Sequence, residues 1–148
     1  MQPRLNYKQL APEGFERMTA LEHYLNTGTG LDKNMLDMVR LLASLLNGCE
    51  FCIHLHQAEL KKAHEPEGRI EGLLEWRESE AYTQRERAAL AWTESVTNIQ
   101  QGHAPDAVYG EVRAHFSDVE TVNLTLTITN INAWNRLAIS LGAHSSRG

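Results

Sequence analysis

Residues 32–56 read DKNMLDMVRLLASLLNGCEFCIHLH, and this stretch decides the fold. In its first half, apolar residues recur at spacings of three and four, which is the pattern of one apolar helix face. They are Met35, Met38, Val39, Leu42 and Leu46. Asp32 is a suitable N-cap before this run and Gly48 a suitable stop after it. The stretch therefore predicts one helix over residues 32–47 and a second over residues 49–63.

Turn residues and capping patterns divide the rest of the chain into further helical lengths. Thr83 with Glu86, and Ser117 with Glu120, each form the sequence pattern of a capping box at a helix start. Gly and Pro clusters separate the segments. The remaining expected helices cover residues 12–26, 69–77, 83–99, 105–116 and 117–141.

One stretch has an ambiguous period. Val122, Leu124, Leu126 and Ile128 alternate with polar residues, as in a strand. We predict a helix because a capping box precedes this stretch, residues 133–141 continue with a helical pattern, and a lone strand would have no partner. The sequence therefore predicts an all-α bundle of about six to seven helices, and its 148 residues suit a single domain over residues 1–148.

Composition excludes several classes of function. The formal net charge is −5, and Lys and Arg form no basic stripe, so the chain lacks the electrostatic signature of nucleic-acid binding. The longest apolar stretch, residues 38–46, contains Arg40 and is too short to cross a bilayer. The first ten residues have no apolar signal region. We therefore expect no membrane partner and a cytoplasmic location, where a close cysteine pair is more often catalytic or metal-binding than structural.

Both cysteines of the chain lie in one short segment with a histidine nearby. If Cys49 opens a helix, Cys52 lies roughly 60° around its axis and about 4.5 Å along it, so the two sulfurs can form a disulfide. His56 follows Cys52 by four residues and shares its helix face. An imidazole and a helix N-terminus both favour the thiolate, which can attack a peroxide, and the second thiol can trap the resulting sulfenic acid.

Other interpretations of the cysteines remain open at this point. The pair can be half of a zinc site completed by His54, His56 or His64, although no second such pair exists in the chain. The pair can also consist of buried core residues. Attachment of c-type haem is excluded because Ile53, and not histidine, follows Cys52.

Residues 36–56 resemble the signature of the alkylhydroperoxidase D-like branch of the carboxymuconolactone decarboxylase family. That signature is an acidic residue, a serine and then CxxCxxxH, and here it comprises Asp37, Ser44, Cys49, Cys52 and His56. The likeness continues through residues 76–78, 83–92 and 131–136, and spans about 31–141. The resemblance implies an all-helical fold, assembly into a homotrimer or homohexamer, and reduction of hydroperoxides through a cycling disulfide.

The resemblance also implies roles for individual residues. Cys52 would form the sulfenic acid, Cys49 would be the proton donor and resolving thiol, and His56 would belong to a proton relay with the upstream acid. The family usually has glutamate at the position of Asp37, so a direct carboxylate–imidazole hydrogen bond is in question here and a water can bridge the gap. An aspartate with a purely structural role, at the surface or near the N-terminus of its helix, is the alternative.

Two further residues are possible assistants of the site. His54 stands where many relatives carry an acidic or small residue, and a solvated histidine is the simpler interpretation. Ser44 can hydrogen-bond near the dithiol, while a bond to the backbone carbonyl four residues earlier is the simpler account.

We therefore expect an antioxidant oxidoreductase, a thiol-dependent peroxidase with no metal and no organic cofactor. Its electrons would come from a thioredoxin-like, lipoyl or low-molecular-weight thiol. A non-catalytic redox sensor or disulfide adaptor is the alternative. Lactone decarboxylation, the reaction that names the wider family, fits less well because that branch does not depend on a cysteine pair.

Overall fold

Local capping determines where the long helices begin and end. The Asp32 carboxylate accepts a hydrogen bond from the Met35 N–H at 3.0 Å, and Gly48 ends the same helix in the left-handed conformation, with φ of 72°. Both predicted capping boxes form, at Thr83 and at Ser117. These helix boundaries therefore follow from the sequence as expected.

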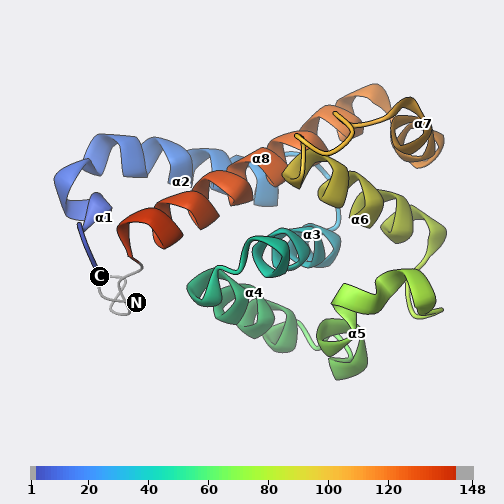
Figure 1. Ribbon diagram of the computed structural model, residues 1–148, viewed down its shortest axis with the longest axis horizontal. Helices are drawn as coiled ribbons and strands as arrows, with labels where there is room; N and C mark the ends of the chain where they lie inside the picture. The colour runs from blue at the N-terminus through green and yellow to red at the C-terminus, as the bar shows by residue number, and fades with distance from the viewer. Residues whose placement is uncertain (1–2, 143–148) are drawn as a thin grey trace.

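The computed structural model describes residues 3–142, and within them every regular element is helical (Figure 1). The elements are α1 (Tyr7–Leu10), α2 (Pro12–Thr27), α3 (Lys33–Asn47), α4 (Glu50–Lys62), α5 (Glu67–Glu71), the 3₁₀ helix η1 (Leu73–Glu78), α6 (Gln84–Thr97), α7 (Asp106–His115) and α8 (Asp118–Leu141). The prediction of an all-α fold is confirmed. None of the helices over these residues is long and apolar enough to span a bilayer.

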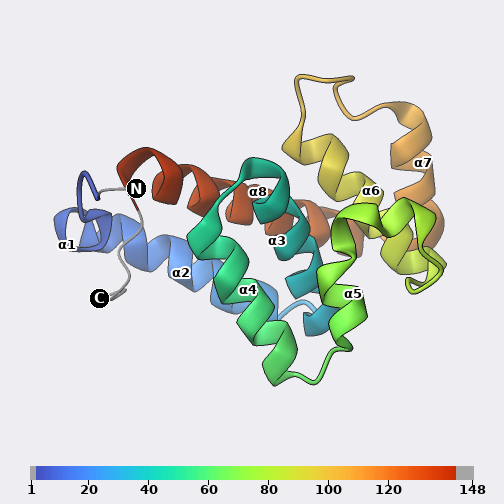
Figure 2. The same ribbon diagram turned by 60° about the horizontal axis from the view of Figure 1, so that its bottom comes forward.

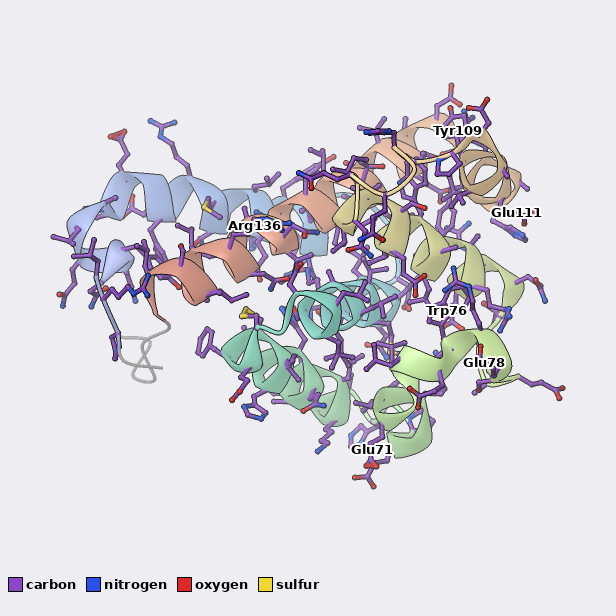
Figure 3. All side chains as sticks on the ribbon, in the orientation of Figure 1. Glu71, Trp76, Glu78, Tyr109, Glu111 and Arg136 are labelled. Atoms are coloured by element: carbon purple, nitrogen blue, oxygen red, sulfur yellow. A yellow bond between two sulfur atoms is a disulfide. The ribbon has the colours of Figure 1, made fainter. Side chains whose placement is uncertain are left out.

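The expected number of six to seven helices is too small for two local reasons. The four-residue α1, capped by Asn6, is too short to show an apolar period in the sequence. The single helix expected over 69–77 is instead two elements, α5 and η1, because the chain leaves helical geometry at Gly72 between them. A second departure from helical geometry, at Glu75, lies inside η1. In η1, Trp76 points toward α6 (Figure 3), where its Nε1 donates to Glu94 at 2.9 Å.

The ambiguous stretch 122–128 is part of α8, as predicted. Leu124 and Ile128, four residues apart, are fully buried, while Val122 is exposed, so burial follows the helical period. The hydroxyls of Thr125 and Thr127 donate to the carbonyls four residues earlier, which satisfies them inside the helix. Threonine content alone therefore did not decide the element.

Helix α3 lies at the centre of the molecule, packed against α4, α6 and α8 (Figures 1 and 2). One apolar cluster joins α3 to α6, α7 and α8, and a second joins it to α4, η1 and α6. Helix α2 runs alongside α8 in both views. The segment before α1 is bound to the end of α8, because the N–H groups of Arg4 and Leu5 both donate to the Leu141 carbonyl. The N-terminal segment, α2 and α8 therefore lie together although they are distant in sequence.

Candidate active site: a buried disulfide beside an apolar cavity

The two cysteines are joined by a disulfide at the start of α4. Gly48 turns the chain out of α3, which makes Cys49 the N-cap of α4 and places Cys52 in its first turn. The Cα atoms of the two cysteines are 5.3 Å apart, and the Cys49 sulfur accepts the Cys52 backbone N–H at 3.3 Å. Cys49 lies one residue before the helix rather than inside it, and the two sulfurs still pair, as the spacing predicted.

Helix α8 covers the disulfide. Both cysteines pack against Ala138 of α8, with Phe51 and Ile139 at the edge of this small cluster. Cys49 and Cys52 are only 2% and 3% exposed. The sulfurs are therefore shielded from bulk solvent, and a reactant must reach them through a defined opening.

His56, one turn of α4 after Cys52, lies close to Asp37 of α3, and both residues are buried. The imidazole Nδ1 is 3.7 Å from the carboxylate Oδ1, which is longer than a hydrogen bond but within the range of a strong electrostatic interaction. The interpretation of Asp37 as a surface residue is wrong, because α4 and its own cationic neighbours enclose the carboxylate. The structure thus brings the predicted acid and the predicted imidazole together without direct bonding.

Two cations from α3 hold the Asp37 carboxylate. Arg40 Nη1 lies 3.0 Å from Oδ1, and Lys33 Nζ lies 2.7 Å from Oδ2. Burial alone would raise the pKa of Asp37, but its contacts with His56, Lys33 and Arg40 lower that pKa from 3.8 to about 2. The carboxylate is therefore an anion at any physiological pH.

Arg40 and Lys33 are residues of the site that were not predicted from the sequence. The signal that could have found them is their spacing, because they lie three residues after and four residues before Asp37 on the same helix face. The side chain of Arg40 is fully buried, which is exceptional for arginine and requires the paired carboxylate.

Ser44 is buried in a polar network between α3 and α8 rather than bonded to the sulfurs. Its hydroxyl donates to the Arg40 carbonyl at 2.8 Å, which is the simpler bond that we expected. It also accepts from Asn135 Nδ2 at 3.1 Å, and the Asn135 Oδ1 accepts from Asn47 at 2.9 Å. The network holds the C-terminal half of α3 against α8, directly next to the dithiol.

His54 lies on the exposed face of α4, in agreement with a solvated histidine. It does not line the cavity at the dithiol. Among residues 3–142, no three His, Cys, Asp or Glu side chains are arranged to hold a metal ion, and each sulfur is bonded to the other.

A cavity of about 270 Å³ leads to Cys52 and His56 from the side of α1 and α2. Most of its wall is apolar, and α1, α2, α4 and α8 all contribute. The lining residues are Asn6, Tyr7, Lys8, Phe15, Thr19, Glu22, Phe51, Cys52, Leu55, His56, Ile131, Trp134 and Ala138. Cys49 does not line it, so the cavity distinguishes the two sulfurs.

The sequence model of the carboxymuconolactone decarboxylase family matches residues 12–95, which is more than half of the chain. The chain belongs to this family. The uncharacterized protein YdfG of Bacillus subtilis is 36% identical to it over 142 residues, covering 96% of both chains. This relative extends the family likeness over nearly the whole chain.

Two solved structures have the same fold as this chain. The crystal structure of ATU0492 from Agrobacterium tumefaciens, a protein of unknown function provisionally named as the antioxidant defence protein AhpD, is 40% identical, covers 97% of both chains and superposes with a TM-score of 0.92. A peroxidase-related protein with an alkylhydroperoxidase AhpD core, from Ralstonia eutropha, is 20% identical with a TM-score of 0.80, covering 93% of this chain and 73% of its own. The chain therefore lies in the AhpD-like branch of the carboxymuconolactone decarboxylase family.

Proposed function

We propose that this member of the carboxymuconolactone decarboxylase family is a thiol-dependent peroxidase that cycles Cys49 and Cys52 between dithiol and disulfide. The observation that carries the proposal is a disulfide with one sulfur, that of Cys52, at the end of an apolar cavity that also contains His56. Family membership and the AhpD-like fold support it.

In the reaction, Cys52 is the attacking sulfur because it alone of the two cysteines lines the cavity. His56 accepts the thiol proton while the sulfur attacks the peroxide, the O–O bond breaks, and the alcohol leaves with a proton. Cys52 is then a sulfenic acid. The Cys49 sulfur attacks it, water leaves, and the disulfide forms. Two electrons pass from the dithiol to the peroxide. Asp37 faces the Nδ1 atom of His56 and orients the imidazole electrostatically.

The cycle requires a thiol reductant to regenerate the dithiol. A thiolate attacks one sulfur of the disulfide, and a second thiol releases the mixed disulfide. A thioredoxin-like, lipoyl or low-molecular-weight thiol supplies these electrons in our proposal. Because a reducible disulfide needs a reducing pool, we place the protein in the cytoplasm.

Cysteine variants test the proposal. Cys52→Ser should abolish consumption of cumene hydroperoxide in the presence of dithiothreitol. Cys49→Ser should retain one rapid oxidation and leave a sulfenic acid on Cys52 that dimedone traps, as detected by mass spectrometry. Full turnover by the Cys52→Ser protein would refute the proposal.

A redox sensor or adaptor is the second candidate, favoured by the burial of both sulfurs. Its disulfide would change the start of α4 without catalytic turnover. Stopped-flow measurement of oxidation separates the two functions, because a sensor oxidises slowly and changes its oligomeric state or partner affinity. Lactone decarboxylation would be independent of both cysteines, so it would survive in the Cys52→Ser protein.

We propose in addition that the protein forms a homotrimer or homohexamer. Support comes from exposed apolar side chains, which are Val119 and Val122 of α8 and Tyr109 of α7. Tyr109, labelled in Figure 3, and Val122 line the same surface hollow. Light scattering coupled to size-exclusion chromatography measures the mass directly. Val122→Asp should lower it, while a monomeric parent protein would exclude the assembly.

A further inference from the structure

We infer that Lys33 and Arg40 are positioning residues of the thiol site, which hold the Asp37 carboxylate on α3 and weaken the field that it exerts on His56, the proton acceptor for Cys52. The inference deepens the proposed function and rests on it for its catalytic meaning.

The contacts of the Asp37 carboxylate come first. Its Oδ1 faces two nitrogens, Arg40 Nη1 at 3.0 Å and His56 Nδ1 at 3.7 Å, while its Oδ2 faces Lys33 Nζ at 2.7 Å. Each carboxylate oxygen is therefore closer to a permanent cation than to the imidazole. Both cations therefore reduce the field that the carboxylate exerts on His56.

The charges of this cluster determine the electrostatic field at the His56 imidazole. An isolated carboxylate beside an imidazole favours the imidazolium. Here two cations face one anion, and the side chains of Asp37 and Arg40 are only 3% and 2% exposed, so water screens them little. Glu59 lies 3.5 Å from Lys33 and offsets part of its charge at the surface. The two cations, Arg40 buried and Lys33 half-exposed, therefore weaken the field of the carboxylate at His56.

Other charges near His56 do not alter this conclusion. Across the cavity, Lys8 of α1 and Glu22 of α2 have opposite signs, and the α8 side chains that line it are uncharged. On α4 itself the neighbours are Glu59, which faces Lys33, and the thiol of Cys52 in the reduced protein. The α3 cluster therefore makes the dominant fixed charge beside the ring.

Helix stability does not explain Lys33. It is the first residue of α3, where the helix dipole disfavours a cation, and a lysine four residues before an acid is the less favourable order of such a pair. Its position is explained by the contact with Asp37, whose other oxygen Arg40 occupies.

The test measures alkylation of Cys52 by iodoacetamide in a Cys49→Ser background, where one thiol remains. Without Lys33, the carboxylate exerts a stronger field at His56, so transfer of the Cys52 proton to the imidazole becomes more favourable. We expect K33Q to raise the alkylation rate at pH 6 by roughly three- to ten-fold. At pH 9 the rates should agree, because the thiol is ionised in both proteins.

Two controls isolate the mechanism. K62Q removes the same charge from the exposed far end of α4, and it should change the rate at pH 6 by less than two-fold. In a D37N background K33Q should have equally little effect, because Lys33 acts through the carboxylate. A K33Q protein that is folded by circular dichroism but reacts no faster at pH 6 would overturn the inference. Absence of peroxide turnover with the predicted alkylation pattern would instead refute only the proposed function.

Discussion

Replacement of Asp37 by asparagine tests whether the buried carboxylate stabilises the site. The two side chains have nearly the same size, so the change removes a charge without creating a cavity. It leaves the guanidinium of Arg40 buried and without an anion, because Asp37 is its ion-pair partner at 3.0 Å. It also removes the partner of Lys33 and the anion beside His56.

The size of the effect follows from the lowered pKa of Asp37. A fall from 3.8 to about 2 corresponds to roughly 2.4 kcal/mol of stability at neutral pH, at about 1.36 kcal/mol for each pH unit. Loss of one partner from a buried ion pair typically costs about 3–5 kcal/mol. We therefore expect D37N to lower the free energy of unfolding by about 2–5 kcal/mol at pH 7.

The same pKa gives the dependence on pH. Because folding lowers the pKa, the carboxylate stabilises the protein fully above pH 3.8, and this contribution disappears as the pH falls through about 2. The parent protein should therefore lose this stability in acid, while D37N, which has no carboxyl group at this position, should lack that component.

Urea unfolding followed by circular dichroism measures both effects, with the protein oxidised and its concentration constant. D118N is a matched control, because the Asp118 side chain is 87% exposed and its loss should matter far less. Equal urea midpoints for D37N and the parent at pH 7, with the same loss of stability in acid, would refute the assignment of Asp37 as a stabilising buried anion.

Two further predictions concern the cavity and the polar network. Phe15 lines the cavity and packs edge-on against Trp134 with ring centroids 5.4 Å apart, so F15A should lower kcat/KM for cumene hydroperoxide by about ten-fold through lost apolar contact, with a smaller effect on hydrogen peroxide. An equal fall for both peroxides in steady-state assays would contradict a role in substrate selection. N135A should lower the free energy of unfolding by about 1–3 kcal/mol, because it deprives Ser44 and Asn47 of buried partners. A thermal shift no larger than that of R136A, one residue along α8, would count against the network.

The features that the sequence predicted well depend on neighbours in the chain. The α3–α4 junction needs only the Asp32 cap, the left-handed Gly48 and the Cys49 cap, all within one segment. The cysteine pair and His56 are positioned by the pitch of a single helix. Such interactions span three or four residues, so their residue types and spacing are enough to predict them.

The features that the sequence did not predict depend on packing between distant segments. Lys33 and Arg40 have the right spacing from Asp37, but only the packing of α3 against its neighbours shows that Asp37 and Arg40 are buried. The cavity joins α1 and α2 to α4 and α8, and no local pattern connects Phe15 with Trp134. Burial and convergence are tertiary properties, so residue spacing alone left the two interpretations of Asp37 open.

The short side chain of Asp37 and the positions of Lys33 and Arg40 are structurally linked. The resemblance to the AhpD-like branch implies glutamate here, and a glutamate side chain would extend about 1.5 Å farther, enough to shorten the 3.7 Å separation from His56 to hydrogen-bond distance. The shorter aspartate keeps its carboxylate near its own helix, where Lys33 and Arg40 reach it from four residues before and three residues after. The carboxylate therefore makes no direct hydrogen bond to the imidazole and faces it across 3.7 Å, with both cations in contact with the same carboxylate. D37E alone would move the carboxylate away from Arg40, so the acid and its cations must change together.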